Sequence, residues 1–182
     1  MASKAGGAGS KFLALVMAAI LTAGLSARAE RGATVPVLPQ DASDTRQAMA
    51  EAEVRWIAGK TGWKTASVPR IEVRTTRDLA IMFFGNAEGY EGVRPLALYA
   101  RDQHILFLAD ALALDNLLDQ SILLHELVHH MQVGNNVEFD CREETERQAY
   151  RLQVEWLREH GVAQPYAFVG VSQSQIDGLT CP

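Results

Sequence analysis

The stretch DNLLDQSILLHELVHHMQ, residues 115–132, decides how this 182-residue chain folds. Its apolar residues point in nearly every direction around a helical wheel, and a helix that is apolar all round is buried. Three polar side chains, His125, Glu126 and His129, nevertheless lie within it. Burying them without partners would cost on the order of several kcal/mol. The sequence therefore predicts that a metal ion or a hydrogen-bond network satisfies them.

The spacing of the three side chains favours a metal with hydrolytic chemistry. At about 100° per residue, His125 and His129 lie one turn apart on one face of the helix and can hold the same ion. Catalytic zinc takes three protein ligands and keeps one position open for water, whose pKa it lowers to roughly 7. Glu126 lies about 100° further round the helix, where it can take a proton from that water. We therefore predict one Zn²⁺ per chain, with Glu126 as the general base.

The third ligand is expected from a second helix, predicted over residues 142–160. Its acids are Glu143, Glu144, Glu146, Glu155 and Glu159. Glu146 falls near the middle of the apolar face, close in angle to Tyr150 and Leu157, and a carboxylate aimed at a core needs a partner. Glu143 lies at the border of that face, where it either holds a histidine nitrogen or suits the helix dipole. Glu146 is the predicted ligand.

The sequence also indicates roles for other polar groups near the predicted site. His130 lies about 140° from His125 on the helix, so it is expected to serve the helix end, where a partly positive imidazole suits the dipole. A hydrolytic site also needs a donor for the developing oxyanion. Tyr166 and Tyr90 are the predicted donors because both lie in predicted loops. The further candidates are Tyr99, His104, Tyr150 and His160.

The N-terminal 29 residues have the pattern of a signal peptide. Lys4 and Lys11 precede an apolar segment over residues 12–25, and Ala27-Arg28-Ala29 offers a cleavage site. The apolar segment is shorter than the roughly 20 residues that span a bilayer, although an uncleaved anchor is the alternative. The mature protein is predicted to be periplasmic or secreted, with no stable membrane insertion after cleavage.

Charge and cysteine content fit that prediction. Removing residues 1–29 leaves 14 basic against 22 acidic residues, a net charge of −8, which argues against nucleic acid as a partner. Cys141 and Cys181 are the two cysteines. In an oxidising compartment such a pair predicts a disulfide, worth about 4 kcal/mol of chain entropy. Metal ligation by cysteine is the alternative, which the long spacing disfavours.

Helical and strand patterns predict one α+β domain over residues 30–182, with its core at about 70–160. A short sheet with a hairpin is expected to pack on the histidine-bearing helix and on the second helix. The predicted helices cover residues 43–58, 115–132 and 142–160, with a short helix or turn at 77–84; the predicted strands cover 70–75, 96–100 and 104–109; and the tail, 162–182, has strand or loop character.

The motif His125-Glu126-Leu127-Val128-His129, followed by Glu146-Arg147-Gln148-Ala149-Tyr150, resembles the gluzincin branch of the zincin metallopeptidases. The resemblance covers about residues 70–160 and implies a minimal zincin-like domain in which an edge strand holds a peptide or protein substrate over the zinc. It implies the ligands and base named above. Many relatives have an acid where this chain has Tyr150, which leaves open what supports the ligands. The alternative is a non-catalytic zincin-like domain that binds metal or stabilises its core.

Overall fold

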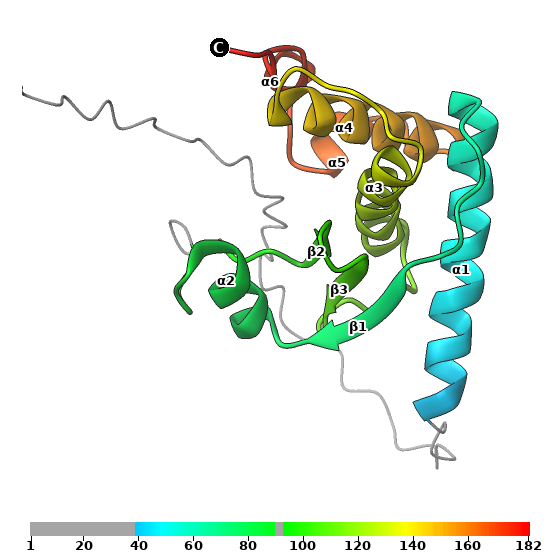
Figure 1. Cartoon of the computed structure of the whole chain (residues 1–182), viewed down its shortest axis with the longest axis vertical. Helices are drawn as coiled ribbons and strands as arrows, with labels where there is room; N and C mark the ends of the chain where they lie inside the picture. Colours follow the sequence, from blue (N-terminus) through cyan, green and yellow to red (C-terminus); the bar gives the residue numbers. More distant parts are fainter. Residues whose placement is uncertain (1–38, 90–92) are drawn as a thin grey trace, which may run out of the picture.

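The computed structural model describes residues 39–89 and 93–182, with side chains described from residue 43 (Figure 1). The predicted signal peptide, residues 1–29, and Tyr90 lie outside the described residues. The described chain has the predicted α+β architecture. Its elements are α1 (Pro39–Thr61), β1 (Arg70–Arg74), α2 (Thr76–Phe84), β2 (Ala97–Ala100), β3 (Ile105–Ala109), α3 (Leu117–Gly134), α4 (Arg142–Glu159), α5 (Pro165–Phe168) and α6 (Gln173–Asp177).

A three-stranded mixed sheet lies beneath α3 in the view of Figure 1. Its strand order is β1-β3-β2, with β1 parallel and β2 antiparallel to β3. All five residues of β3 are buried, as expected for a central strand. The predicted hairpin is confirmed: β2 and β3 pair through a turn at residues 101–104, where His104 has a positive φ of 53°. β2 is consequently an edge strand.

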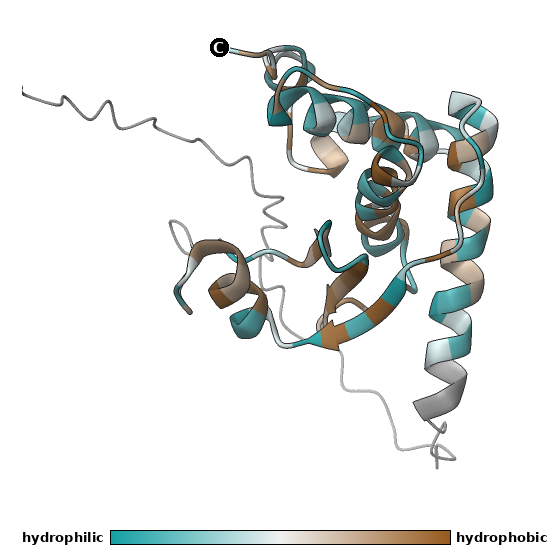
Figure 2. Ribbon diagram, in the orientation of Figure 1, coloured by the Kyte–Doolittle hydropathy of each residue, from teal (hydrophilic) through white to brown (hydrophobic). Residues whose placement is uncertain are grey.

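Helix α3 forms the centre of the core, as its all-round apolar pattern predicted. It packs against α1, α4 and β2, and Figure 2 shows its apolar colouring together with that of β3. Asn116 caps its start by accepting a hydrogen bond from the backbone N–H of Asp119. The buried apolar residues of α3 are Ile122, Leu123, Leu124, Leu127, Val128 and Met131.

Helix α1 extends beyond the predicted residues 43–58 at both ends. It passes through Gly59 and ends before Gly62, whose φ of 73° suits a glycine at the end of a helix. Ala50, Val54 and Ile57 are buried in the same core cluster as α3 and α4. The hydrophobic core therefore reaches further along the chain than residues 70–160.

Polar contacts join the C-terminal ends of α1 and α4. The Lys60 ammonium lies 2.9 Å from Glu155 and also pairs with Glu159. The Trp56 indole N–H donates to Glu159 over 2.8 Å. Because these side chains are partly exposed, the ion pairs contribute modestly to stability and chiefly fix how the two helices meet.

The tail does not have the predicted strand or loop character, because two short helices form there. Pro165 begins α5, where its fixed φ suits the first helical position. Ser172 and Gln175 form a reciprocal capping box at the start of α6. The predicted Cys141–Cys181 disulfide is confirmed and joins the end of the tail to the start of α4. Within the described chain, no helix combines the length and the apolar character needed to cross a membrane.

Candidate metal centre

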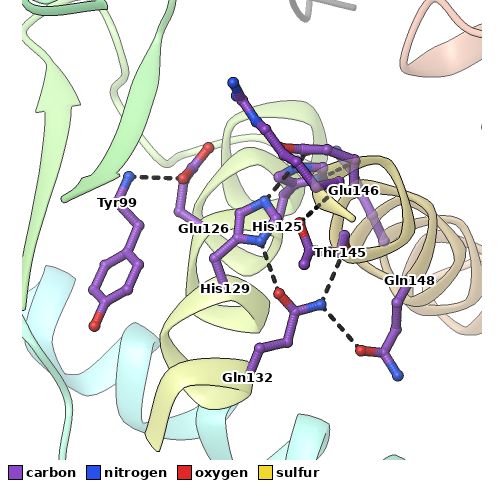
Figure 3. A network of polar contacts seen from close by, with 10 residues as sticks. Tyr99, His125, Glu126, His129, Gln132, Thr145, Glu146 and Gln148 are labelled. Atoms are coloured by element: carbon purple, nitrogen blue, oxygen red, sulfur yellow. Dashed lines mark hydrogen bonds and ion pairs between the residues drawn. The ribbon is translucent and has the colours of Figure 1, made fainter. Parts of the chain in front are cut away.

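Helices α3 and α4 bring the three predicted ligands together (Figure 3). The Nε2 atoms of His125 and His129 each lie 3.3 Å from one oxygen of Glu146, Oε2. One ligand atom from each residue falls within 4.8 Å of the others. The two imidazoles come from successive turns of α3, and Glu146 reaches them from the first turns of α4. The described part of the chain thus contains a group that could hold a metal ion.

The donor set and its spacing fit zinc. Zinc takes imidazole nitrogen and carboxylate oxygen at roughly 2.0–2.2 Å in tetrahedral geometry. Ligand atoms at that distance from one ion are about 3.3–3.4 Å apart. The two nitrogen-to-oxygen distances to Glu146 have this length. Two of the three pairs of ligand atoms therefore have the spacing that a tetrahedral ion requires, and the third pair lies within 4.8 Å.

Gln153 fixes the tautomer of His125. Its amide nitrogen donates to the Ser121 hydroxyl over 3.0 Å, and that hydroxyl donates in turn to the carbonyl of Leu118. The amide oxygen of Gln153 is left to accept, and it lies 3.2 Å from His125 Nδ1. Nδ1 must carry the proton in this contact. Nε2 is therefore the ring nitrogen of His125 that faces Glu146 and the candidate metal position.

Gln132 fixes the tautomer of His129 in the same way as Gln153 fixes that of His125. Its amide nitrogen donates to the backbone carbonyl of Thr145 and to the side-chain oxygen of Gln148, both over 3.0 Å. Its amide oxygen lies 3.0 Å from His129 Nδ1 and must accept that proton. The contact with Thr145 also ties the ligand-bearing part of α3 to the first turn of α4. Two buried glutamines thus contact the Nδ1 atoms of the two predicted histidine ligands.

The charges of the cluster are strongly coupled. Burial lowers the pKa of His129, but the hydrogen bond and charge of Glu146 outweigh burial and raise this pKa to about 9. Burial likewise raises the pKa of Glu146, whereas contacts with His125 and His129 hold it well below its usual value. Both shifts mean that a positive charge between the imidazoles and the carboxylate is stabilised. The cluster therefore favours positive charge at its centre.

Glu126 lies beside the cluster and is oriented by the sheet. The backbone N–H of Tyr99, in the edge strand β2, donates to Glu126 Oε2 over 2.8 Å (Figure 3). This contact holds one carboxylate oxygen and leaves the other, Oε1, to act on a ligand. The predicted base is thus close to the predicted ligands without belonging to their group of three.

A cleft with a volume of about 360 Å³ opens over these residues. It contains all four predicted site residues, His125, Glu126, His129 and Glu146. One wall comes from α2 and the segment leading into β2, and the other from α4. The remaining lining residues are Phe83, Pro95, Leu96, Ala97, Leu98, Tyr99, Arg101, Ile122, Arg142, Thr145 and Tyr150. A mainly apolar cleft with a few convergent polar groups is typical of a ligand-binding site.

His130 does not serve the end of α3 as predicted. Its Nε2 lies 2.7 Å from the carbonyl of Ser67, and its Nδ1 lies 3.0 Å from the hydroxyl of Tyr99. The Tyr99 hydroxyl also lies 3.0 Å from His104 Nδ1. Burial lowers the pKa of His130, so the ring is neutral and carries no charge toward the helix dipole. Its contacts join α3 to β2 and to the segment before β1.

The predicted oxyanion donor Tyr166 is not brought to the cleft. Its ring lies 5.2 Å from the guanidinium carbon of Arg158, near the C-terminal end of α4. Arg158 is twelve residues beyond Glu146, a rise of about 18 Å along a helix. His160 is also remote, because it stacks on Trp156 at that same end. Among the described residues, those of the tail do not line the cleft.

Three contributors to the site were missed by the sequence analysis: Gln132, Gln153 and Arg142. Gln153 lies seven residues after Glu146, on the same face of α4, and Gln132 lies three residues after His129. A buried amide at helical spacing from a ligand was therefore the available signal. Arg142 had no such signal, since an arginine in the first turn of a helix usually faces solvent.

Comparison with known proteins adds a family but no characterised relative. Residues 41–175 match the family model described as "Domain of unknown function (DUF6647)". None of the curated proteins and none of the solved structures compared with the chain matches it. The matched segment covers well over half of the chain and includes α3, α4 and all four predicted site residues. The chain therefore belongs to the DUF6647 family of domains of unknown function.

Proposed function

We propose that this protein is a zinc-dependent peptidase. The observation that carries the proposal is the convergence of His125 Nε2, His129 Nε2 and Glu146 Oε2 beside a separate, oriented carboxylate, Glu126. A purely structural zinc site has four protein ligands, leaves no open position and needs no neighbouring base. Here three predicted ligands face a cleft, and a further side chain, the acid Glu126, lies next to them. The resemblance of the motif to the gluzincins points to the same chemistry.

In this proposal, His125, His129 and Glu146 hold the ion, and Gln153 and Gln132 keep both imidazoles in the ligating tautomer. Zinc at this position would polarise a substrate carbonyl and lower the pKa of a water molecule at its open position. Amide hydrolysis forms one C–O bond, breaks one C–N bond and moves one proton from water to the departing amine. Glu126 takes that proton through Oε1 and returns it to the amine nitrogen.

The edge strand and the apolar lining of the cleft indicate how a peptide substrate would lie in it. β2 is an edge strand, and a peptide can extend along such a strand by backbone hydrogen bonds. The residues that approach and form β2 give the cleft an apolar wall that includes Leu96 and Leu98, and Ile122 of α3 adds to it. A peptide with an apolar side chain next to the scissile bond would bury that side chain here. Peptides or unfolded proteins of this kind are the proposed substrate class.

The test combines metal analysis with one substitution. Purified protein should contain close to one zinc per chain, and Glu126→Gln should retain the zinc, because Glu126 is not a ligand. Its activity toward fluorescent casein should fall by about 10²–10⁴-fold, the usual contribution of a general base. Glu143→Gln, a first-turn acid of α4 outside the group of three, is the matched control and should keep full activity.

The outcomes separate the enzyme from the alternative. Zinc-loaded wild-type protein whose activity disappears in Glu126→Gln supports the peptidase. Bound zinc with no difference between wild type and Glu126→Gln would leave the non-catalytic zincin-like domain as the better description. Absence of bound zinc after dialysis against micromolar zinc would contradict the peptidase and would leave a non-catalytic domain whose core is stabilised by polar contacts.

Export is proposed on two features of the chain. The Cys141–Cys181 disulfide is stable in oxidising compartments and uncommon in the cytosol. The sequence of residues 1–29 has the features of a cleavable leader. The compartment would then be the periplasm or the exterior of the cell. N-terminal sequencing of the exported protein should find Glu30 first, and an intact leader on the exported protein would contradict cleavage.

A further inference from the structure

The proposed hydrolysis leaves one requirement unassigned, which is a donor for the negative charge that develops on the attacked carbonyl oxygen. The side-chain donors in the cleft are few, and most are engaged elsewhere. The Tyr99 hydroxyl contacts His130 and His104, on the side away from the ligands. The Thr145 hydroxyl donates to the backbone carbonyl of Arg142 over 2.7 Å. Tyr150 is 2% exposed and packs its ring against His125, so it offers little surface to a substrate.

Arg142 differs from these groups in both position and exposure. Its guanidinium Nε lies 3.6 Å from Glu146 Oε1, the carboxylate oxygen that does not face the histidines. Its side chain is 62% exposed, so a ligand can reach the guanidinium. Within the described chain, Arg142 is the basic side chain other than the histidines that pairs with the predicted ligands. A positive charge therefore stands at the mouth of the cleft, beside the carboxylate of the predicted ligand Glu146.

Several contacts keep Arg142 in this place. It is the first residue of α4 and follows Cys141, which the disulfide attaches to the tail. Its carbonyl accepts the Thr145 hydroxyl, which fixes the first turn. Its guanidinium carbon lies 5.6 Å from the centre of the Phe83 ring on α2, a cation–π contact across the cleft. The guanidinium thus contacts both Phe83 on α2 and Glu146 on α4, while much of its side chain stays exposed to a ligand.

We propose that Arg142 is a catalytic residue that donates hydrogen bonds to the carbonyl oxygen as its negative charge develops. The proposal rests on the zinc peptidase function above. A guanidinium keeps its proton throughout and presents several N–H groups in a fixed fork, which suits a tetrahedral oxyanion. Charge-assisted hydrogen bonds of this kind favour the transition state over the neutral substrate, because the full charge appears only there. Arg142 takes the role that the sequence had assigned to Tyr166 or Tyr90.

The test measures binding, so it does not depend on the natural substrate. N-phosphoryl-Leu-Leu carries a tetrahedral phosphoryl anion where a peptide has its scissile carbonyl, and its affinity for the zinc-loaded protein is measured by calorimetry. Arg142→Ala should weaken binding about 10- to 100-fold, as expected for hydrogen bonds to a charged group. Arg142→Lys keeps the charge without the fork and should fall between wild type and Arg142→Ala. Arg158→Ala, which removes an exposed arginine near the far end of α4 and outside the cleft, should stay within about threefold of wild type.

Zinc affinity distinguishes this role from a structural one. Arg142 has the same sign of charge as the metal, so its removal should leave zinc affinity unchanged or raise it. A residue that merely held Glu146 in place would, when removed, lower zinc affinity. Equal probe binding by wild type and Arg142→Ala would overturn the proposal, as would a loss of zinc in the variant. If the wild-type protein itself holds no zinc, the peptidase function fails first, which separates the two failures.

Discussion

Glu146 on α4 is partly buried, with a side chain that is 26% exposed, whereas Glu53 on α1 is buried, and their surroundings are opposite. Glu146 contacts two imidazoles and Arg142, and these contacts hold its pKa well below the usual value although burial alone would raise it. Glu53 is 4% exposed, neither of its oxygens has a hydrogen-bond partner, and burial raises its pKa well above 4.5. The same side chain is therefore ionised in one place and neutral in the other.

The difference shows that the partners of an acid withdrawn from solvent indicate whether it belongs to a ligand-binding site. A buried carboxylate with converging partners can exchange a shared proton for a cation, so its burial prepares a site. A buried carboxyl group without partners is a cost to stability, with no ligand indicated by its neighbours. Burial alone would have favoured Glu53, the more buried of the two, so the groups that face each carboxylate decide the difference.

Replacing Glu146 should have the largest effect on zinc affinity, because it removes one of the three predicted ligands. Glu146→Ala leaves two imidazoles for the ion and should weaken zinc binding by more than about 100-fold, beyond the loss typical of residues that only support ligands. Competition with a chelating dye measures the affinity. Circular dichroism must show that the variant is folded.

The control for this variant is Glu143→Ala, three residues earlier on α4. Glu143 lies outside the group of three, so zinc affinity should stay within about threefold of wild type. Equal losses in Glu143→Ala and Glu146→Ala would contradict the assignment of the third ligand.

Smaller losses should follow from the two glutamines that orient the imidazoles. Gln153→Ala and Gln132→Ala each free one histidine to change tautomer, and each should reduce zinc affinity about 10- to 100-fold. Gln148→Ala removes only an acceptor of Gln132, which keeps its bond to Thr145, so the loss should be smaller. The same dye competition measures all three. A loss for Gln148→Ala as large as for Gln132→Ala would show that helix packing, and not tautomer control, sets zinc affinity.

The amino-acid pattern predicted those parts of the site that lie within one helix. The spacing of His125, Glu126 and His129 is a local property of α3, and the angle of Glu146 is a local property of α4. Which groups of one helix face the other depends on how α3 and α4 are aligned, and no helical wheel contains that information. The contact of Gln153 with His125 depends on this alignment, whereas Gln132 contacts His129 within α3 and only its bonds to Thr145 and Gln148 depend on it.

The same limit explains the differences in the fold. The tail forms short helices because Pro165, the Ser172 capping box and the disulfide act together, while the apolar pattern of residues 162–182 is too weak to indicate a period. The start of α4 became part of the cleft only through packing against Phe83 of α2, which a helix-by-helix prediction does not include.

The smallest of the predicted effects concerns Glu53 and its dependence on pH. Its pKa is higher in the folded than in the unfolded protein, so the folded state holds a proton that the unfolded state has released once the pH exceeds 4.5. The free energy of unfolding should therefore fall with rising pH above that value, by about 1.4 kcal/mol per pH unit at most. The fall ends where Glu53 ionises in the folded state. Urea unfolding at several pH values from 4 to 8 measures it.

Glu53→Gln isolates this contribution, because it keeps the shape of the side chain and cannot ionise. Relative to wild type, it should gain stability as the pH rises above 4.5, until wild-type Glu53 ionises in the folded state, and differ little at pH 4, where wild-type Glu53 is mostly protonated in both states. Glu51→Gln, an exposed change on the same helix, should show no such trend. Parallel curves for wild type and Glu53→Gln would mean that Glu53 has a partner in solution. Glu53 would then resemble Glu146 in having a partner that stabilises its ionised form.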